Sequence, residues 1–266
     1  MLNKIILTSA IIFFSIFFIT CGSDTPTSNN NTGGGTVGPY PRFNLRTGST
    51  FIYTNDSLPN GGSPIRTRII TNDSILTPVT LAGFLCFPIR STSVDTVTNQ
   101  TQIDTAFVRY DSTGGKFYQY GIRKLIDTTQ PGTWDLVADF SVPRTTEWLV
   151  ANIVYTYTIP GFGTVTFSGP LKGKVADSTT IQTTSNPPQT IHCYKIQLTA
   201  TLSGSLFVTI STTIVIDYYL AFTAVGNPTG LARLWLNPFT FTTTPNIGSF
   251  PYPGFDRILR NYTIAP

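Results

Sequence analysis

The chain has 266 residues, of which 41% are hydrophobic and only 11% are charged, and its formal net charge is +4. Ordinary soluble domains carry about 25% charged residues, and the basic residues group no further than Arg66-Thr67-Arg68 and Arg123-Lys124, so neither a disordered polyelectrolyte nor a nucleic-acid-binding surface is expected. Thr, Val, Ile, Phe and Tyr are plentiful while Glu147 is the sole glutamate, a composition that favours strands over helices.

The first element is an apolar segment that ends at a cysteine. Residues 5–19 are almost wholly apolar, which fits a signal peptide and is shorter than the roughly 20 residues of a transmembrane helix. The sequence Phe18-Ile19-Thr20-Cys21-Gly22 resembles the lipobox of bacterial lipoproteins, with Phe18 and Thr20 in place of the usual leucine and small residue. The resemblance implies that residues 1–20 are a signal peptide and that Cys21 is lipidated. An uncleaved N-terminal anchor is the alternative.

A polar segment rich in Ser, Asn, Thr and Gly follows the cysteine. Residues 21–38 have little apolar surface to bury, and we expect the lipidated Cys21 and a flexible tether there. Acyl chains on Cys21 would hold the protein at a bilayer. The predicted location is therefore the bacterial cell envelope, lipid-anchored to the outer membrane on its periplasmic or surface face.

The rest of the chain, residues 39–266, alternates short apolar runs with turn-forming residues, as all-β domains do. Residues 194–202 alternate apolar and polar side chains, which predicts a strand with one buried face. Residues 81–89 are apolar except Gly83 and predict one buried strand, and residues 60–64 and 111–115 predict turns. Two Thr-Asn-Asp-Ser sequences, at 54–57 and 71–74, are expected as turns at strand ends.

These features predict one all-β domain over residues 39–266. Its sheet is expected to be either an antiparallel β-sandwich or a large curved half-barrel.

Two sequence stretches resemble motifs of uncharacterised secreted lipoproteins of Bacteroidota-like bacteria. Gly48-Ser49-Thr50-Phe51-Ile52-Tyr53 is similar to their opening motif, with Phe51 replacing the usual tryptophan. Residues 191–196 (Ile-His-Cys-Tyr-Lys-Ile) and 218–226 are similar to their closing motif. The resemblance implies an antiparallel β fold like that of half-barrel periplasmic carriers of lipid or lipoprotein, and it brings no established activity.

Two cysteines remain after lipidation of Cys21. Cys86 and Cys193 can form a disulfide in an oxidising compartment if their Cα atoms lie within about 7 Å. The alternative is that both are small buried side chains without a disulfide.

No catalytic or metal-binding pattern stands out. His192 is the only histidine, it has no Gly-x-Ser-x-Gly motif to accompany it, and next to Cys193 it lacks the second ligand pair of a zinc site. Apart from Glu147 the acids are aspartates, most of which are expected in turns. We therefore expect no enzyme, no cofactor and no metal.

Aromatic residues are the remaining candidates for binding. Trp134, Trp148 and Trp235, with many tyrosines, can line a ligand groove or simply fill the core. The leading prediction is a membrane-anchored envelope lipoprotein with a non-enzymatic structural or interaction role. One alternative is a carrier that binds a lipid or other apolar ligand in a curved sheet, and another is a polysaccharide-binding module. The expected partners are the membrane, through the lipid anchor, and an apolar ligand, a glycan or another envelope protein.

Overall fold

The computed structural model describes residues 40–43, 45–122, 132–159, 163–205, 208–222, 229–246 and 248–266. The predicted signal peptide (residues 1–20), the lipidated Cys21 and the tether (21–38) lie outside the described residues, so these expectations stay predictions. Within the described ranges there are fifteen strands and no α-helix, and so no helix there is long and apolar enough to cross a membrane.

The strands are rich in β-branched and aromatic residues, whose side chains suit a pleated surface. In chain order they are β1 (Thr50–Leu58), β2 (Ile65–Ile75), β3 (Val79–Leu81), β4 (Phe84–Asp95), β5 (Thr101–Asp111), β6 (Lys116–Tyr120), β7 (Trp134–Asp139), β8 (Trp148–Ile159), β9 (Gly163–Gln182), β10 (Thr190–Ser205), β11 (Thr209–Ala221), β12 (Gly230–Leu236), β13 (Phe239–Thr244), β14 (Ser249–Tyr252) and β15 (Gly254–Thr263).

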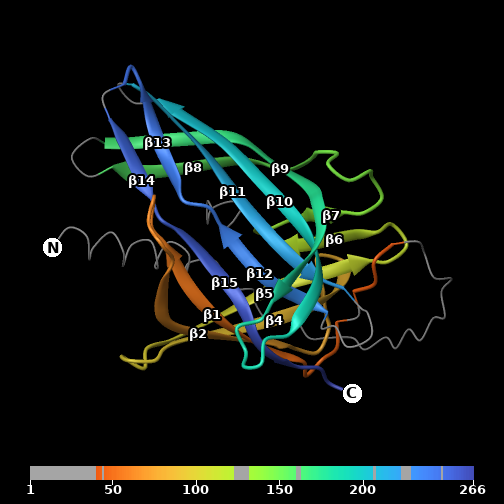
Figure 1. The fold of residues 1–266 in the computed structure, drawn as a ribbon. Helices are drawn as coiled ribbons and strands as arrows, with labels where there is room; N and C mark the ends of the chain where they lie inside the picture. The colour runs from red at the N-terminus through yellow and green to blue at the C-terminus, as the bar shows by residue number, and fades with distance from the viewer. Residues whose placement is uncertain are drawn as a thin grey trace.

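All neighbouring strands pair antiparallel in one sheet, in the order β7-β6-β5-β4-β2-β1-β15-β12-β11-β10-β9-β8 (Figure 1). The hairpin of β13 and β14 joins the sheet through β11, and β3 pairs only with β4. The two ends of the path meet, because β7 contacts β8 and β9, and Trp148 Nε1 on β8 donates a hydrogen bond to the Leu136 carbonyl on β7 over 3.0 Å. The all-β prediction is confirmed, and of its two forms the single curved sheet is the one observed.

The inner face of the sheet carries the apolar core. On β10, Ile196, Leu198, Ala200 and Leu202 are at most 4% exposed, and the polar residues between them face the other way. The alternation in residues 194–202 therefore predicted the buried face of this strand correctly.

A segment that precedes β1 closes part of this core. Phe43 packs against the rings of Tyr110, Phe117 and Phe140, with ring centres 4.9, 5.6 and 5.8 Å away. The Tyr110 hydroxyl donates to the carbonyl of Pro41 and holds the segment in place. The first described residues are thus part of the folded domain.

The apolar run of residues 81–89 is not one buried strand, and that prediction was wrong. Ala82 and Gly83 have φ of 48° and 80°, the positive values of a two-residue hairpin turn, so β3 ends at Leu81 and β4 begins at Phe84. Phe84 is 46% and Leu85 is 61% exposed. Hydrophobicity alone did not reveal the turn, because only one of its two residues, Gly83, is typical of turns.

The structure places Cys86 and Cys193 in different surroundings. Cys86 lies on β4, where its Sγ donates to the Val79 carbonyl, and Cys193 lies on β10 within the main apolar core, of which Cys86 is not part. Both are buried thiols, and no disulfide joins them. The structure thus has the second of the two expected arrangements, in which each is a small buried side chain.

Candidate functional site

A row of directly opposed residues crosses seven strands on one face of the sheet. Opposed residues on neighbouring antiparallel strands point to the same face. Gln197 lies between Ile196 and Leu198, which point into the core, so the row faces outward. From β2 to β9 the row consists of Arg66, Asp56, Asp256, Trp235, Asp217, Gln197 and Lys174. With Lys195, Tyr219 and Arg233, which oppose one another beside the row, these residues are the outer band.

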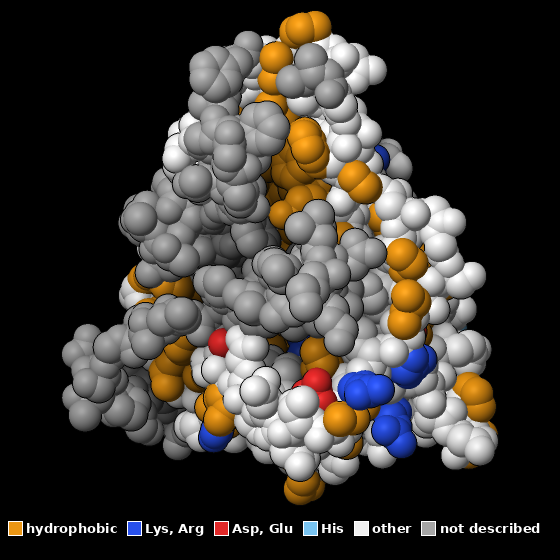
Figure 2. Space-filling view, turned by 90° about the vertical axis from the view of Figure 1, so that its left-hand side faces the viewer, with side chains coloured by type: hydrophobic (Ala, Val, Ile, Leu, Met, Phe, Trp, Pro, Cys, Tyr) orange, Lys and Arg blue, Asp and Glu red, His pale blue; other side chains and the backbone are white. Residues whose placement is uncertain are grey.

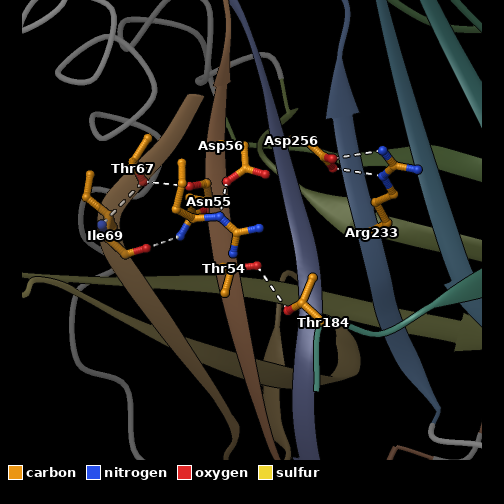
Figure 3. A network of polar contacts seen from close by, with 9 residues as sticks. Thr54, Asn55, Asp56, Thr67, Ile69, Thr184, Arg233 and Asp256 are labelled. Atoms are coloured by element: carbon orange, nitrogen blue, oxygen red, sulfur yellow. Dashed lines mark hydrogen bonds and ion pairs between the residues drawn. The ribbon is translucent and has the colours of Figure 1, made fainter. Parts of the chain in front are cut away.

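Asp256 makes the strongest ion pair in the outer band. The Arg233 guanidinium binds its carboxylate with two parallel hydrogen bonds, Nε to Oδ1 and a terminal nitrogen to Oδ2, each 2.8 Å long (Figure 3). The side chains of Arg233 and Asp256 are 21% and 10% exposed. Such bidentate, partly buried pairs fix orientation as well as charge.

The other two carboxylates of the outer band also lie beside cations. Lys195 Nζ is 2.9 Å from Asp217, which accepts a further hydrogen bond from Gln197 over 3.1 Å. Burial acts to lower the pKa of Lys195, but the hydrogen bond to Asp217 and its charge outweigh that effect and raise the pKa. Arg66 Nε is 2.5 Å from Asp56. Each carboxylate of the band therefore has a cationic neighbour.

Two of these carboxylates, Asp56 and Asp256, lie directly opposite each other on β1 and β15 (Figure 3). Burial raises the pKa of Asp56, the Arg66 charge lowers it, and the charge of Asp256 raises it again. Like charges in opposed positions destabilise a sheet. The charges of Arg66 and Arg233 offset this repulsion. At the centre of the band, two anions therefore lie between two cations.

A change of register between β1 and β2 positions Asp56. The pairing shifts between Thr54 and Asp56, and the intervening Asn55 bonds across the irregularity. Its Nδ2 donates to the Ile69 carbonyl over 3.0 Å, and its own carbonyl accepts from Thr67 Oγ1 over 2.7 Å (Figure 3). Irregularities of this kind re-aim side chains within a sheet. Local polar contacts thus hold the backbone next to Asp56 in place.

Aromatic rings pack against Arg233, one of the cations of the outer band. The guanidinium carbon of Arg233 is 4.2 Å from the centre of the Trp235 ring and 5.6 Å from that of Tyr219. Trp235 Nε1 donates to Asn237 Oδ1 over 2.8 Å. Tyr219 and Trp235 are both partly exposed. The band therefore offers two amphipathic rings among fixed charges, a composition suited to recognition.

Sequence reasoning missed Asp56 of the outer band because it placed this residue in a turn. Asp56 and Asp73 belong to the two Thr-Asn-Asp-Ser sequences, but these are strand residues of β1 and β2 and form no turn, so that prediction was wrong. The turns expected over residues 60–64 and 111–115 are confirmed, the second with Asp111 Oδ1 accepting from the amides of Thr113 and Gly114. The missed signal is the β-branched and aromatic neighbourhood of the two sequences, such as Phe51-Ile52-Tyr53 before the first.

The other residues noted from the sequence are not brought together. His192 is exposed on β10 opposite Thr180, and Glu147 forms a surface ion pair with Lys172 at 3.2 Å. In the described part of the chain no three His, Cys, Asp or Glu side chains are grouped so that they could hold a metal ion.

The three tryptophans lie apart as well. Trp148 bonds across the junction of β7 and β8, and Trp134 Nε1 donates to the Leu81 carbonyl over 3.3 Å. Of the three tryptophans, only Trp235 belongs to the outer band.

A second polar group lies on the inner face, near β1, β2, β5 and β15. Asp73 opposes the core residue Phe51 and pairs with Arg257 at 3.0 Å, and Arg257 lies 4.7 Å from the centre of the Tyr53 ring. Burial raises the pKa of nearby Asp104 to about 6, although its hydrogen bond from Gln102 and the charge of Arg257 oppose the shift. Asp104 thus differs from the outer-band acids in having no cation in direct contact among the ion pairs of the described residues.

Comparison with known proteins gives two similar solved structures. A Bacteroides fragilis protein described as exported and as having a YmcC-like fold aligns with a TM-score of 0.44 and 11% identity, over 85% of this chain and 100% of that one. A Parabacteroides distasonis protein described as a lipoprotein aligns with a TM-score of 0.44 and 10% identity, over 84% of this chain and 97% of that one. No protein-family model and no curated protein matches the chain. At this level of similarity neither structure assigns an activity.

Proposed function

We propose that the chain is a membrane-anchored lipoprotein of the bacterial cell envelope with a non-enzymatic binding role. The apolar segment of residues 5–19 followed by Cys21 supports export and lipidation. The outer band, which lies on the rolled domain that this anchor would hold at the membrane, supports the binding role. In this proposal the outer band contacts a partner in the envelope.

The observation that carries the binding role is the pairing of every outer-band carboxylate with a cation. General acid–base catalysis requires a group that exchanges its proton with substrate near the working pH. Asp217 and Asp256 instead accept hydrogen bonds from Lys195 and Arg233. Fixed charges and aromatic rings on a broad sheet face favour recognition of a surface over proton transfer.

Metabolic labelling tests the anchor. Cells that express the full chain are grown with radiolabelled palmitate, and their membranes are separated from soluble fractions. We expect label on the wild-type protein and its recovery with membranes, whereas Cys21→Ser removes the label and releases the protein. Thr20→Ser, which leaves the cysteine in place, is the matched control. An unlabelled wild-type protein would overturn the lipoprotein proposal.

A glycan is the partner that one observation favours. The apolar face of a sugar ring packs on an aromatic ring while its hydroxyls bond to neighbouring polar groups. Tyr219 and Trp235 provide partly exposed rings, and Asn237 and Asp217 provide such polar groups at the same face.

Binding to envelope polysaccharide from the source cells, measured by calorimetry, tests this second candidate. We expect Trp235→Ala and Tyr219→Ala each to weaken binding about tenfold, the loss of one ring contact. Trp134→Ala, which removes an indole from another part of the sheet, should leave the affinity unchanged. Equal losses in all three variants would show that the rings act only through stability.

Native mass spectrometry separates these roles from the carrier alternative. The Cys21→Ser protein is exported behind a conventional signal peptide and purified from its envelope. We expect the mass of the bare polypeptide. A co-purifying mass of lipid size would instead favour the carrier with an apolar ligand.

A further inference from the structure

The outer face of β2, β4 and β5 differs from the outer band in its charge. Asp73, Ser91 and Asp104 oppose one another on these strands and share the inner face with Phe51. The side chains that alternate with them therefore point outward. The outward residues that matter here are Arg68 on β2, Arg90 on β4, and Ile103 and Arg109 on β5. These four residues, with Phe84 on β4, whose ring packs on Arg109, are the basic face.

Arg68 and Arg90 give this face a positive charge. Both are exposed, and neither takes part in the ion pairs found among the described residues. Of the acids of the three strands, Asp73 and Asp104 point inward and Asp111 bonds to turn amides at a strand end. Asp95 is partly exposed, and hydrogen bonds from the amides of Thr98 and Val97, with the charge of Arg68, lower its pKa.

Large apolar side chains are exposed around these arginines. Ile103 is 51% and Phe84 is 46% exposed. Phe84 is held over the same surface, because the Arg109 guanidinium lies between its ring and that of Tyr118, 4.1 and 3.8 Å from the two ring centres. On the side of the molecule shown in Figure 2, apolar side chains are exposed in both the upper and the lower part, and most of the charged ones lie in the lower part. On the basic face the arginines Arg68, Arg90 and Arg109 outnumber the nearby acid Asp95, so the exposed apolar side chains lie in a surface of net positive charge.

We propose that the basic face rests on an anionic lipid surface. Each arginine near such a surface contributes through attraction to the headgroups, and Phe84 and Ile103 can enter the interface between headgroups and acyl chains. This inference deepens the proposed function, because the lipid on Cys21 would bring the domain to a bilayer. The chain between Cys21 and Tyr40, the first described residue, links the proposed anchor to the domain.

The test uses the mature chain with Cys21→Ser, so that no acyl chain contributes. Binding to phosphatidylcholine vesicles that contain 30% phosphatidylglycerol, and to pure phosphatidylcholine vesicles, is measured by co-sedimentation. We expect binding to the anionic vesicles only, and a loss of that binding at high salt. Arg68→Glu/Arg90→Glu should weaken it about tenfold or more, because two attractions become repulsions.

Arg144→Glu/Lys172→Glu is the matched control, since it makes the same charge change at exposed positions outside the basic face. It should retain most of the binding, and both double variants should unfold at the wild-type urea concentration. Ile103→Ser should weaken binding without changing charge.

The proposal is overturned if anionic vesicles bind no better than neutral ones, or if the control variant loses as much as Arg68→Glu/Arg90→Glu. Because the acyl chain is absent here, a failure of palmitate labelling and a failure of vesicle binding are independent results.

Discussion

In the outer band, each carboxylate lies beside a cation and aromatic rings pack against Arg233, whereas on the basic face Arg68 and Arg90 are exposed on a surface that also exposes apolar side chains. The two regions belong to one sheet and meet at the pairing of β1 with β2, where Arg66 contacts Asp56. The strand geometry is the same in both. The regions differ in which residue type occupies the outward positions.

This comparison separates two uses of charge. A partly buried, bidentate pair such as Arg233 with Asp256 acts over a few ångströms and depends on geometry. Exposed arginines contribute little to the free energy of folding, but their field extends about 8–10 Å at physiological salt. We therefore expect the outer band to matter for stability and short-range recognition, and the basic face to matter for long-range attraction.

The largest effect is expected from breaking the bidentate pair. Arg233→Leu leaves Asp256 largely buried beside Asp56 without its cation, and we expect a loss of roughly 3 kcal/mol in the free energy of unfolding. The same substitution on the basic face, Arg90→Leu, should change it by less than about 0.5 kcal/mol. Urea unfolding followed by tryptophan fluorescence measures both.

The double variant Arg233→Leu/Asp256→Leu serves as the control for this prediction. Removing both charges should recover much of the stability, because no uncompensated carboxylate remains. If Arg90→Leu costs as much as Arg233→Leu, the contrast between the two regions is wrong.

A smaller effect is expected at Asp104, the half-buried inner-face acid. Its pKa is raised to about 6, so the folded protein holds this proton more tightly than the unfolded chain does. The stabilising contribution is complete below about pH 4 and is lost as the pH rises through 6. Asp104→Asn should therefore match the wild type at pH 4 and exceed its stability by about 1 kcal/mol at pH 7, a value reduced because the side chain is partly exposed.

The pH dependence of urea unfolding tests whether the pKa of Asp104 is raised in the folded protein. Urea midpoints of wild type and Asp104→Asn, measured between pH 4 and 8, should begin to diverge just above pH 4 and differ by a constant amount above about pH 7. Asp111→Asn, at a turn, provides the comparison, and a constant difference across the whole range would contradict the raised pKa.

Sequence patterns predicted the parts of the fold in which local chemistry decides the outcome. The alternation in residues 194–202 identified the buried face of β10, because each outward position there is polar. The same pattern failed for residues 81–89, where a turn is made by Ala82 and Gly83 within an apolar run. A run without polar residues carries no information on which of its members face the core.

The outer band could not be predicted from the sequence because it is assembled by register. Asp56, Asp217 and Asp256 are separated by up to 200 residues and become neighbours only when β1, β15, β12 and β11 pair in this order. Short polar sequences such as Thr54-Asn55-Asp56-Ser57 suit a turn as well as an outward strand face. Tertiary pairing decides between the two, and it placed both Thr-Asn-Asp-Ser sequences in strands.

The smallest effect is expected at the exposed pair of Glu147 and Lys172, and it tests whether burial is what separates the outer band from other ion pairs. The two side chains are 50% and 51% exposed and 3.2 Å apart. Glu147→Gln should reduce the free energy of unfolding by less than about 0.5 kcal/mol, and 0.5 M NaCl should abolish the difference because water and ions already screen the pair. The cost of Arg233→Leu should persist in the same salt, because Asp256 is shielded from solvent. If Glu147→Gln and Arg233→Leu reduced the free energy of unfolding equally, or if salt removed both losses, the ion pairs of the outer band would stabilise the protein no more than exposed pairs do. The proposed difference between buried and exposed pairs would then be wrong.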